Sequence, residues 1–278
     1  MIDEIILLRH GRTPYNLTHH LQGQVDVPLD IIGQWQVDQS ALALAQQYYW
    51  AKVSNIRRHP EQLPQPSPGA DRRSDISEYQ NAPAGKRAMK VISSDLYRAV
   101  QTAHAFADIL GLPVKLDSRL REQNFGTWDG KTEAEIRQID SEAFDAWQTH
   151  RADPERLARQ YGIESRTTLG QRGAETLTSF VLDAVEDPTP TTLMLVGHGG
   201  FITATLETLL GMETEKTPLG GISNAFWSKL TPVYTASSTV EWKLAAFNCG
   251  PDIAAVVDWD NGPEELRTAD MPLTTPGI

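Results

Sequence analysis

The chain has few features of a secreted or membrane protein. Cys249 is the single cysteine among 278 residues, so no disulfide can form within the chain. No apolar run approaches the roughly 20 residues that a membrane-spanning helix needs. The first residues also lack the basic and apolar segments of a secretory signal. We therefore expect a cytoplasmic protein with no membrane partner.

Positive charge is scarce as well. The chain has 25 Lys and Arg residues against 36 Asp and Glu residues, which gives a formal net charge of -11. Long-range repulsion by this charge disfavours nucleic acid and acidic lipid as partners. The sequence has no P-loop, no GxGxxG pattern and no ligand spacing typical of a zinc site. We expect neither a nucleotide cofactor nor a metal, and a phosphate-bearing ligand would be held by local positive charge.

Short β-branched runs alternate with longer helical patterns along the chain. Strands are expected at residues 4–8, 90–93, 192–196, 223–230 and 240–247. Apolar residues spaced by three and four predict helices over 96–110, 136–147, 177–184 and 201–209. Gly111 and Gly211 follow two of these segments, where they are typical of helix ends. The alternation predicts an α/β fold, a three-layer α/β/α sandwich with a mostly parallel central sheet.

Two stretches interrupt this order. Residues 52–90 are rich in Pro, Gly, Ser and Arg and contain eight basic and four acidic residues, a local charge of +4. We interpret this stretch as an insertion; its composition favours a solvated loop, with a lid or a partner interface left open. Residues 250–278 are Pro/Gly-rich and acidic, and we expect an extended tail over the surface. A single domain is expected over residues 1–249.

Two of the predicted strands lead directly into a histidine. The first strand precedes His10, and the third precedes His198. Ligands of open α/β sheets bind beyond the carboxyl ends of the strands, so we expect both imidazoles in one crevice. Arg9 and Arg12 flank the first histidine and would repel a metal ion. The expected guest of the crevice is therefore an anion.

Two predicted helix starts add to this anion site. Arg98 lies in the first turn of the helix after the second strand, where free N–H groups and the helix dipole favour negative charge. Gly199 and Gly200 permit close backbone approach at the start of a later helix. Taken singly, Arg9 or Arg98 is compatible with a surface ion pair and His198 with a buried structural histidine. The presence of all three residues together is a far more specific indication of an anion site.

Five motifs follow one another in an order that matches a known family. Residues 9–16 read RHGRTPYN, which fits the signature RHGxTxxN. The other motifs are LQG at 21–23, SDLYRAVQTA at 94–103, LREQNFGTWDG at 120–130 and VGHGG at 196–200. Together they resemble the histidine phosphatase superfamily, the phosphoglycerate mutase-like proteins. The resemblance spans residues 4–50 and 90–247 and implies the phosphoglycerate mutase-like form of the three-layer sandwich.

The resemblance also implies a role for each matched residue. His10 would be the nucleophile, because a neutral imidazole attacks phosphorus once a neighbouring backbone carbonyl holds its other ring nitrogen. Glu122 would protonate the leaving oxygen and then activate water. The phosphoryl oxygens would be held by Arg9, Arg98 and His198, which replace a magnesium ion, so no metal or other cofactor is expected. Further substrate contacts are expected from Arg12, Thr13, Asn16, Gln22, Gly23 and Gly199.

The segment after Glu122 distinguishes phosphatases from mutases among the proteins that the chain resembles. Mutases of the superfamily typically have Tyr-Gly and a lysine in this segment and a pair of arginines further along the chain. Residues 123–130 of this chain read QNFGTWDG, which resembles the phosphatase branch. A metal-independent phosphomonoesterase that acts on a small phosphorylated metabolite through phosphohistidine is the favoured hypothesis. A cofactor-dependent phosphoglycerate mutase is the second hypothesis, and a non-catalytic phosphate-binding or scaffold protein is the third.

The sequence leaves the substrate and the oligomeric state open. A sugar phosphate, a phosphoglycerate derivative, a nucleotide and a phosphopeptide all fit the motifs. Arginines between residues 151 and 166 and the 52–90 insertion are expected to wall the pocket and to select among them. A homo-oligomer is compatible with the sequence, which does not indicate its size.

Overall fold

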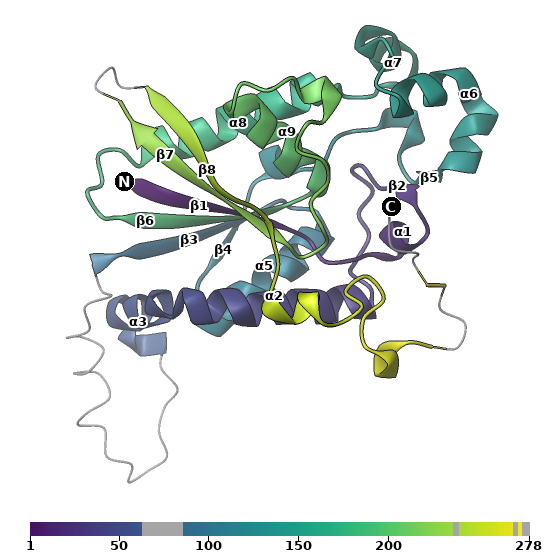
Figure 1. Ribbon diagram of the computed structural model, residues 1–278. Coiled ribbons are helices and arrows are strands. Elements are labelled where there is room, and N and C mark those ends of the chain that lie inside the picture. The colour runs from purple at the N-terminus through teal and green to yellow at the C-terminus, as the bar shows by residue number, and fades with distance from the viewer. Residues whose placement is uncertain (63–85, 236–238, 269–271, 274–278) are drawn as a thin grey trace.

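A six-stranded sheet forms the centre of the protein (Figure 1). The computed structural model describes residues 1–62, 86–235, 239–268 and 272–273. The strands follow the spatial order β4 (Val114–Leu116), β3 (Ala88–Ser93), β6 (Thr191–Gly197), β1 (Ile2–Arg9), β7 (Trp227–Tyr234) and β8 (Val240–Cys249). The first four are parallel to one another, whereas β7 runs antiparallel to both β1 and β8. The expected mostly parallel sheet is confirmed.

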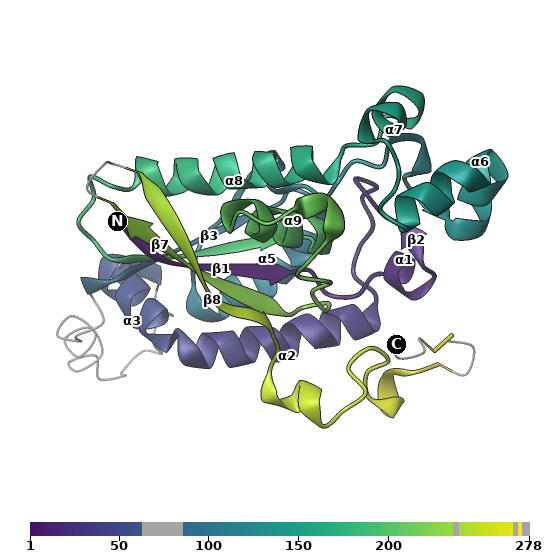
Figure 2. The same ribbon diagram turned by 45° about the horizontal axis from the view of Figure 1, so that its top comes forward.

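Helices cover both faces of this sheet, so the molecule has the three layers that the sequence predicts (Figures 1 and 2). One layer contains α2 (Ile31–Gln47), α3 (Tyr49–Arg58) and α5 (Tyr97–Leu110), and the other contains α8 (Arg166–Asp183) and α9 (Gly199–Leu209). Successive residues of β1 point to opposite faces. Ile6 and Leu8 join the core cluster under α2 and α5, whereas Ile5 and Leu7 join the cluster under α8 and α9. Both faces of the strand are therefore apolar, as in a fully covered parallel sheet.

A smaller group of elements lies beyond the carboxyl ends of the parallel strands (Figure 1). It comprises α1 (Pro14–Leu17), the two-stranded sheet of β2 (His20–Leu21) and β5 (Lys131–Thr132), α6 (Glu133–Gln148) and α7 (Pro154–Tyr161). Trp128 is fully buried at its centre and contacts the rings of Phe144, Trp147 and Tyr161. This aromatic cluster gives α6 and α7 a core of their own.

Short 3₁₀ turns complete the described chain; they are Pro60–Gln62, Ser118–Leu120, Gly126–Trp128, Thr214–Lys216, Asp252–Ala255 and Glu264–Leu266. Within this part of the chain, no helix is both long and apolar enough to cross a bilayer.

Most predicted elements exist, with shifted ends. The strand predicted at 223–230 begins later, at Trp227, and the short strand β4 was not predicted. Gly111 ends α5 in the left-handed conformation, with φ of 66°, as its position indicates.

Helices α2, α3 and α7 were not predicted from the sequence. In α2 the apolar stripe is broken by the buried residues Gly33 and Gln36, and both of these contact Arg12 in the loop after β1.

The two interrupting stretches are partly described. α3 extends to Arg58 and buries Ala51 and Ser54, so the first part of the expected insertion is helical, and residues 63–85 lie outside the described residues. The tail was expected to lie over the surface. It crosses α2, but Trp259 is only 7% exposed and contacts the ring of Trp35. Part of the tail therefore belongs to the core.

Leucines on the two helices under the sheet provide a test of this packing. Leu110 of α5 is 1% exposed, whereas Leu42 of α2 is 50% exposed. We expect Leu110→Ala to lower the free energy of unfolding by about 2–5 kcal/mol, because it removes apolar contacts and leaves a cavity. Leu42→Ala should change it by less than about 0.5 kcal/mol. Urea denaturation of both variants measures the difference, and equal losses would contradict this packing.

Candidate active site

The site lies where β1 and β6 end side by side. Arg9 is paired with Gly197 in the parallel register, so the next residues, His10 and His198, leave the sheet together. Their ring centroids are 5.2 Å apart. The structure thus brings together the two imidazoles that the sequence places at opposite ends of the chain.

His10 is buried and held in one orientation. Its Nδ1 lies 2.7 Å from the carbonyl oxygen of Gly11, and its own carbonyl accepts hydrogen bonds from the backbone of Ala225 and the side chain of Asn224. The carbonyl contact requires the proton on Nδ1, which leaves the lone pair on Nε2. Burial, and then the positive charges of Arg98 and Arg9, keep the pKa of His10 well below its usual value of 6.5. The ring is therefore neutral at neutral pH.

Arg98 enters the site from the first turn of α5 and is fully buried. Its Nη1 donates to the carbonyl of Val25 and its Nη2 to the carbonyl of Gly23, both at 2.8 Å. Burial lowers the pKa of Arg98 to about 10, opposed mainly by Glu122, so the group stays cationic at neutral pH. Gly23 is required here: its φ is +48°, and a Cβ would lie 1.7 Å from a carboxylate oxygen of Asp129.

Arg9 lies on the other side of the site. Its Nη1 donates to the carbonyl of Ile222, and its side chain packs against Gly199, where a Cβ would lie 3.2 Å from Nε. Burial lowers the pKa of Arg9, and the negative charges of Glu122 and Asp260 oppose this shift. Gly199 therefore contributes close packing against the arginine.

His198 completes the set of nitrogen donors. Its Nε2 lies 2.9 Å from Oγ of Ser94, and burial followed by the charge of Arg98 keeps its pKa well below 6.5. Among the buried side-chain atoms of the described residues, His198 Nδ1, Arg9 Nε and Arg98 Nε have no hydrogen-bond partner. Buried donors normally find a partner. Three unpartnered nitrogens on neighbouring residues fit an anion such as phosphate.

Glu122 lies at the start of α9, against this group. Its carboxylate accepts hydrogen bonds from the backbone N–H groups of Gly200 at 2.9 Å, Phe201 at 2.8 Å and Gln123 at 2.9 Å. A Cβ on Gly200 would lie 2.6 Å from Glu122 Oε1, so only glycine allows this approach. The side chain of Arg172 donates to the Glu122 carbonyl and holds the segment in place.

The remaining predicted site residues form the loop after His10. Thr13 caps α1 and donates from Oγ1 to Gln22 Oε1 at 2.9 Å. Asn16 accepts through Oδ1 from Thr13 and Asn224, so its Nδ2 is the group that can face a ligand. Arg12 differs from the expectation of a substrate contact. Its side chain is 3% exposed, and its donors reach a carboxylate oxygen of Asp30 and the carbonyl of Asp260. These contacts make Arg12 a support of the loop.

Sequence reasoning missed three residues that hold this site. Ser94 lies in a recognised motif, which was the available signal for its contact with His198. Asn224 and Arg172 lie outside the five motifs, and their contacts with His10 and Glu122 depend on packing between distant segments.

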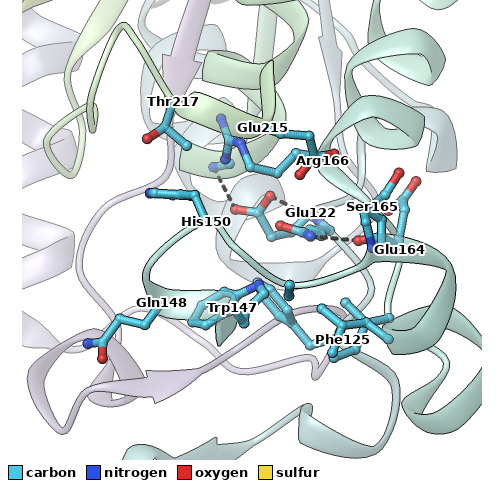
Figure 3. Close-up of a pocket in the computed structure, with 16 residues that line it drawn as sticks. Glu122, Phe125, Trp147, Gln148, His150, Glu164, Ser165, Arg166, Glu215 and Thr217 are labelled. Carbon is cyan, nitrogen blue, oxygen red and sulfur yellow. Dashed lines mark hydrogen bonds between the residues drawn. The ribbon is translucent and has the colours of Figure 1, made fainter. Parts of the chain in front are cut away.

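Two adjoining cavities open from Glu122. The smaller, of about 370 Å³, is lined by Arg9, Gly199 and the loop at 220–222. The larger, of about 490 Å³, lies between α6, α7 and the start of α8, and Phe125 and Trp147 form part of its wall. Four residues line both cavities: Glu122, Arg166, Gly200 and Thr217. In Figure 3, Glu122 lies between Arg166 with Thr217 on one side and Trp147 with Phe125 on the other.

Comparison with known proteins agrees with this geometry. A model of the histidine phosphatase superfamily (branch 1) matches residues 5–58 and 76–245. The chain belongs to this superfamily. The unmatched residues 59–75 of this histidine phosphatase fall within the stretch that the sequence indicates as an insertion.

Two curated relatives and one solved structure illustrate the similarity. Glucosyl-3-phosphoglycerate phosphatase of Mycolicibacterium vanbaalenii is 29% identical over 263 residues, which cover 91% of this chain and 97% of the relative. Probable phosphoglycerate mutase GpmB of Yersinia pestis is 32% identical over 211 residues, 75% of either chain. The structure of a mycobacterial glucosyl-3-phosphoglycerate phosphatase with inorganic phosphate gives a TM-score of 0.62 at 28% identity, covering 90% of this histidine phosphatase and 98% of that chain. The phosphatase class predicted from the sequence is thereby confirmed.

The two buried histidines make the stability of this histidine phosphatase depend on pH. Their pKa values are lowered on folding, so the unfolded chain binds more protons below pH 6.5. The stability is therefore fully present above pH 6.5 and is lost as the pH falls. Each histidine contributes a slope of up to about 1.4 kcal/mol per pH unit.

Below pH 6.5, we expect the slope of His198→Gln to be smaller than that of the wild type by the contribution of one histidine, up to about 1.4 kcal/mol per pH unit. His59→Gln, at a histidine that is 50% exposed, is the matched control for the loss of an imidazole. Urea unfolding at several pH values measures the slopes. An unchanged slope in His198→Gln would show that this ring does not exclude the proton.

Proposed function

We propose that this protein hydrolyses the phosphate monoester of a glycosylated 3-phosphoglycerate through a phosphohistidine on His10. The observation that carries the proposal is the continuity of the two cavities. The smaller cavity is lined by Arg9, next to the buried cluster in which Arg9, Arg98 and His198 carry unpartnered nitrogens beside a neutral His10. The larger cavity has an aromatic wall. A ligand with phosphate at one end and a sugar at the other fits this arrangement.

His10 performs the first step of the proposed reaction. The neutral ring attacks phosphorus through Nε2, because Nδ1 is held by the Gly11 carbonyl. A bond forms between Nε2 and phosphorus as the bond from phosphorus to the substrate oxygen breaks. Arg9 and Arg98 stabilise the equatorial oxygens of the transferring group, since phosphoryl transfer depends mainly on position and charge.

Glu122 handles the protons in both steps. In the acid form it protonates the leaving oxygen, and as a carboxylate it takes a proton from the water that attacks the phosphohistidine. The products are inorganic phosphate, the alcohol and neutral His10. Glu122 is suitably placed, because it lines both cavities and its carboxylate is fixed by the N–H groups of Gly200 and Phe201.

His198 supports the same anion from a fixed tautomer. Ser94 Oγ donates to Nε2 in the orientation that leaves a proton on Nδ1, the atom without a protein partner. Asn16 adds a neutral donor at the mouth of the site. No step requires a metal ion or another cofactor.

The substrate class is supported by the relatives and by the cavity. Glucosyl-3-phosphoglycerate phosphatases match nearly the whole chain in length. Trp147 and Phe125 line the larger cavity and offer flat apolar surface, which suits the faces of a sugar ring. A cytoplasmic location is part of the proposal and rests on the single cysteine and on the class of substrate.

A panel of phosphate esters in EDTA tests the function. We expect phosphate release to be fastest from glucosyl-3-phosphoglycerate, and His10→Ala should lower kcat by about 10³-fold or more, because the nucleophile is lost. His104, a half-exposed histidine of α5, gives the control variant His104→Ala with wild-type kcat. Both variants should unfold at the same urea concentration as the wild type. This result would show that the lower kcat of His10→Ala is not caused by loss of folding.

Two results would change the conclusion. Isomerisation of 3-phosphoglycerate in a coupled assay that exceeds phosphate release would favour a mutase, the activity named for the second relative. Phosphate binding without turnover, unaltered in His10→Ala, would favour a non-catalytic phosphate-binding protein.

A further inference from the structure

A buried ion pair lies where the two cavities meet. Nη2 of Arg166 is 3.0 Å from Oε2 of Glu207, whose side chain is fully buried, and the Arg166 side chain is 17% exposed. Arg166 lines both cavities, as Glu122 does. It therefore faces the middle of any ligand that extends from the phosphate end to the aromatic end (Figure 3).

The protein uses only part of the Arg166 guanidinium. Nε donates to the carbonyl of Thr214 at 3.0 Å, and Nη2 donates to Thr203 Oγ1 at 3.2 Å and to Glu207. Within the described residues Nη1 has no acceptor, and it is not among the buried atoms that lack a partner. Nη1 is therefore accessible from the cavity, with two N–H groups to offer.

The acidic neighbours in the larger cavity are held by other groups. Glu164 is 3.0 Å from Nη2 of Arg172, and Glu215 accepts hydrogen bonds from the backbone and hydroxyl of Thr167 at 2.9 Å. Within the described residues, neither carboxylate forms a hydrogen bond or an ion pair with Arg166, so the Nη1 edge is left for a ligand.

We propose that Arg166 binds the carboxylate of the substrate's glyceryl unit and determines specificity for it. This inference rests on the proposed function. In a glycosylated 3-phosphoglycerate, carbon 3 carries the phosphate and the hydroxyl on carbon 2 carries the sugar, so the carboxylate on carbon 1 lies between them. The junction of the cavities is the corresponding place in the protein. A guanidinium that is already oriented by Glu207 presents a planar edge to that carboxylate.

The same ion pair also anchors the segment between α9 and β7. The backbone N–H of Leu219 donates to Glu207 Oε1 at 3.3 Å, and Arg166 holds the Thr214 carbonyl. An anchoring role alone would lower the turnover of every substrate to the same degree. Carboxylate recognition would change the preference between substrates with and without this group.

The test compares two substrate pairs that differ at the carboxylate. The first pair is 3-phosphoglycerate and glycerol 3-phosphate, and the second is glucosyl-3-phosphoglycerate and its carboxyl-reduced alcohol. Arg166→Lys retains a charge beside Glu207 but loses the planar edge. The double variant Arg166→Gln/Glu207→Gln leaves no unpaired buried charge. Arg159 was expected to wall the pocket, but it is an exposed residue of α7 that lines neither cavity, so Arg159→Gln is the matched control.

We expect the wild type and Arg159→Gln to prefer the carboxylate member of each pair. In both Arg166 variants the ratio of kcat/KM within a pair should fall by about 10- to 100-fold, mainly through KM, since a charge-assisted hydrogen bond is lost. The inference would be overturned if the wild type showed no preference for the carboxylate member. It would also be overturned if both Arg166 variants kept the wild-type ratio of kcat/KM.

The two substrate pairs separate this inference from the proposed function. If the glucosylated ester is hydrolysed no faster than the simple esters while Arg166 controls the ratio between 3-phosphoglycerate and glycerol 3-phosphate, the proposed function fails and the inference holds. If the glucosylated ester is the best substrate and the ratio is insensitive to Arg166, the inference alone fails.

Discussion

The site depends on the parallel pairing of β1 with β6. This register sets Arg9 opposite Gly197, so His10 and His198 emerge next to each other. A slip of one residue would turn the apolar residues of β1 to the wrong faces and would also move the two imidazoles apart. Because both faces of β1 are packed into the core, the core fixes the register and, with it, the geometry of the candidate site.

The pocket places positive groups where water solvates them poorly. Arg98 is fully buried and Arg9 is partly buried, and backbone carbonyls from distant loops accept part of their hydrogen bonds. Within the described residues, the Nε atoms of both arginines and His198 Nδ1 have no hydrogen-bond partner. Desolvated donors of this kind interact strongly with a developing negative charge, because no water has to reorganise. These polar atoms lack a hydrogen-bond partner in the protein and gain one when an anionic ligand binds.

Sequence reasoning located most residues that the structure brings together in the candidate site. His10, Arg98 and His198 follow or begin regular elements with strong periodicity, and motif order identified Glu122, whose position against α9 no spacing indicates. The side chain of Arg12, expected to contact the substrate, donates to Asp30 and to the tail carbonyl of Asp260, which is 248 residues away in the sequence and which no sequence pattern indicates. The helix α2 was missed for a related reason. Its buried Gly33 and Gln36 serve the loop after β1 and interrupt the apolar pattern on which helix prediction depends.

The position of β1 at the middle of the sheet has a consequence for biosynthesis. Its two neighbours, β6 and β7, come from the last third of the chain, and the tail carbonyl that holds Arg12 comes later still. His10 therefore leaves the ribosome before the segments that surround it in the fold. A nascent chain has no complete site until these later segments have been translated, and β1 needs protection from aggregation during that interval.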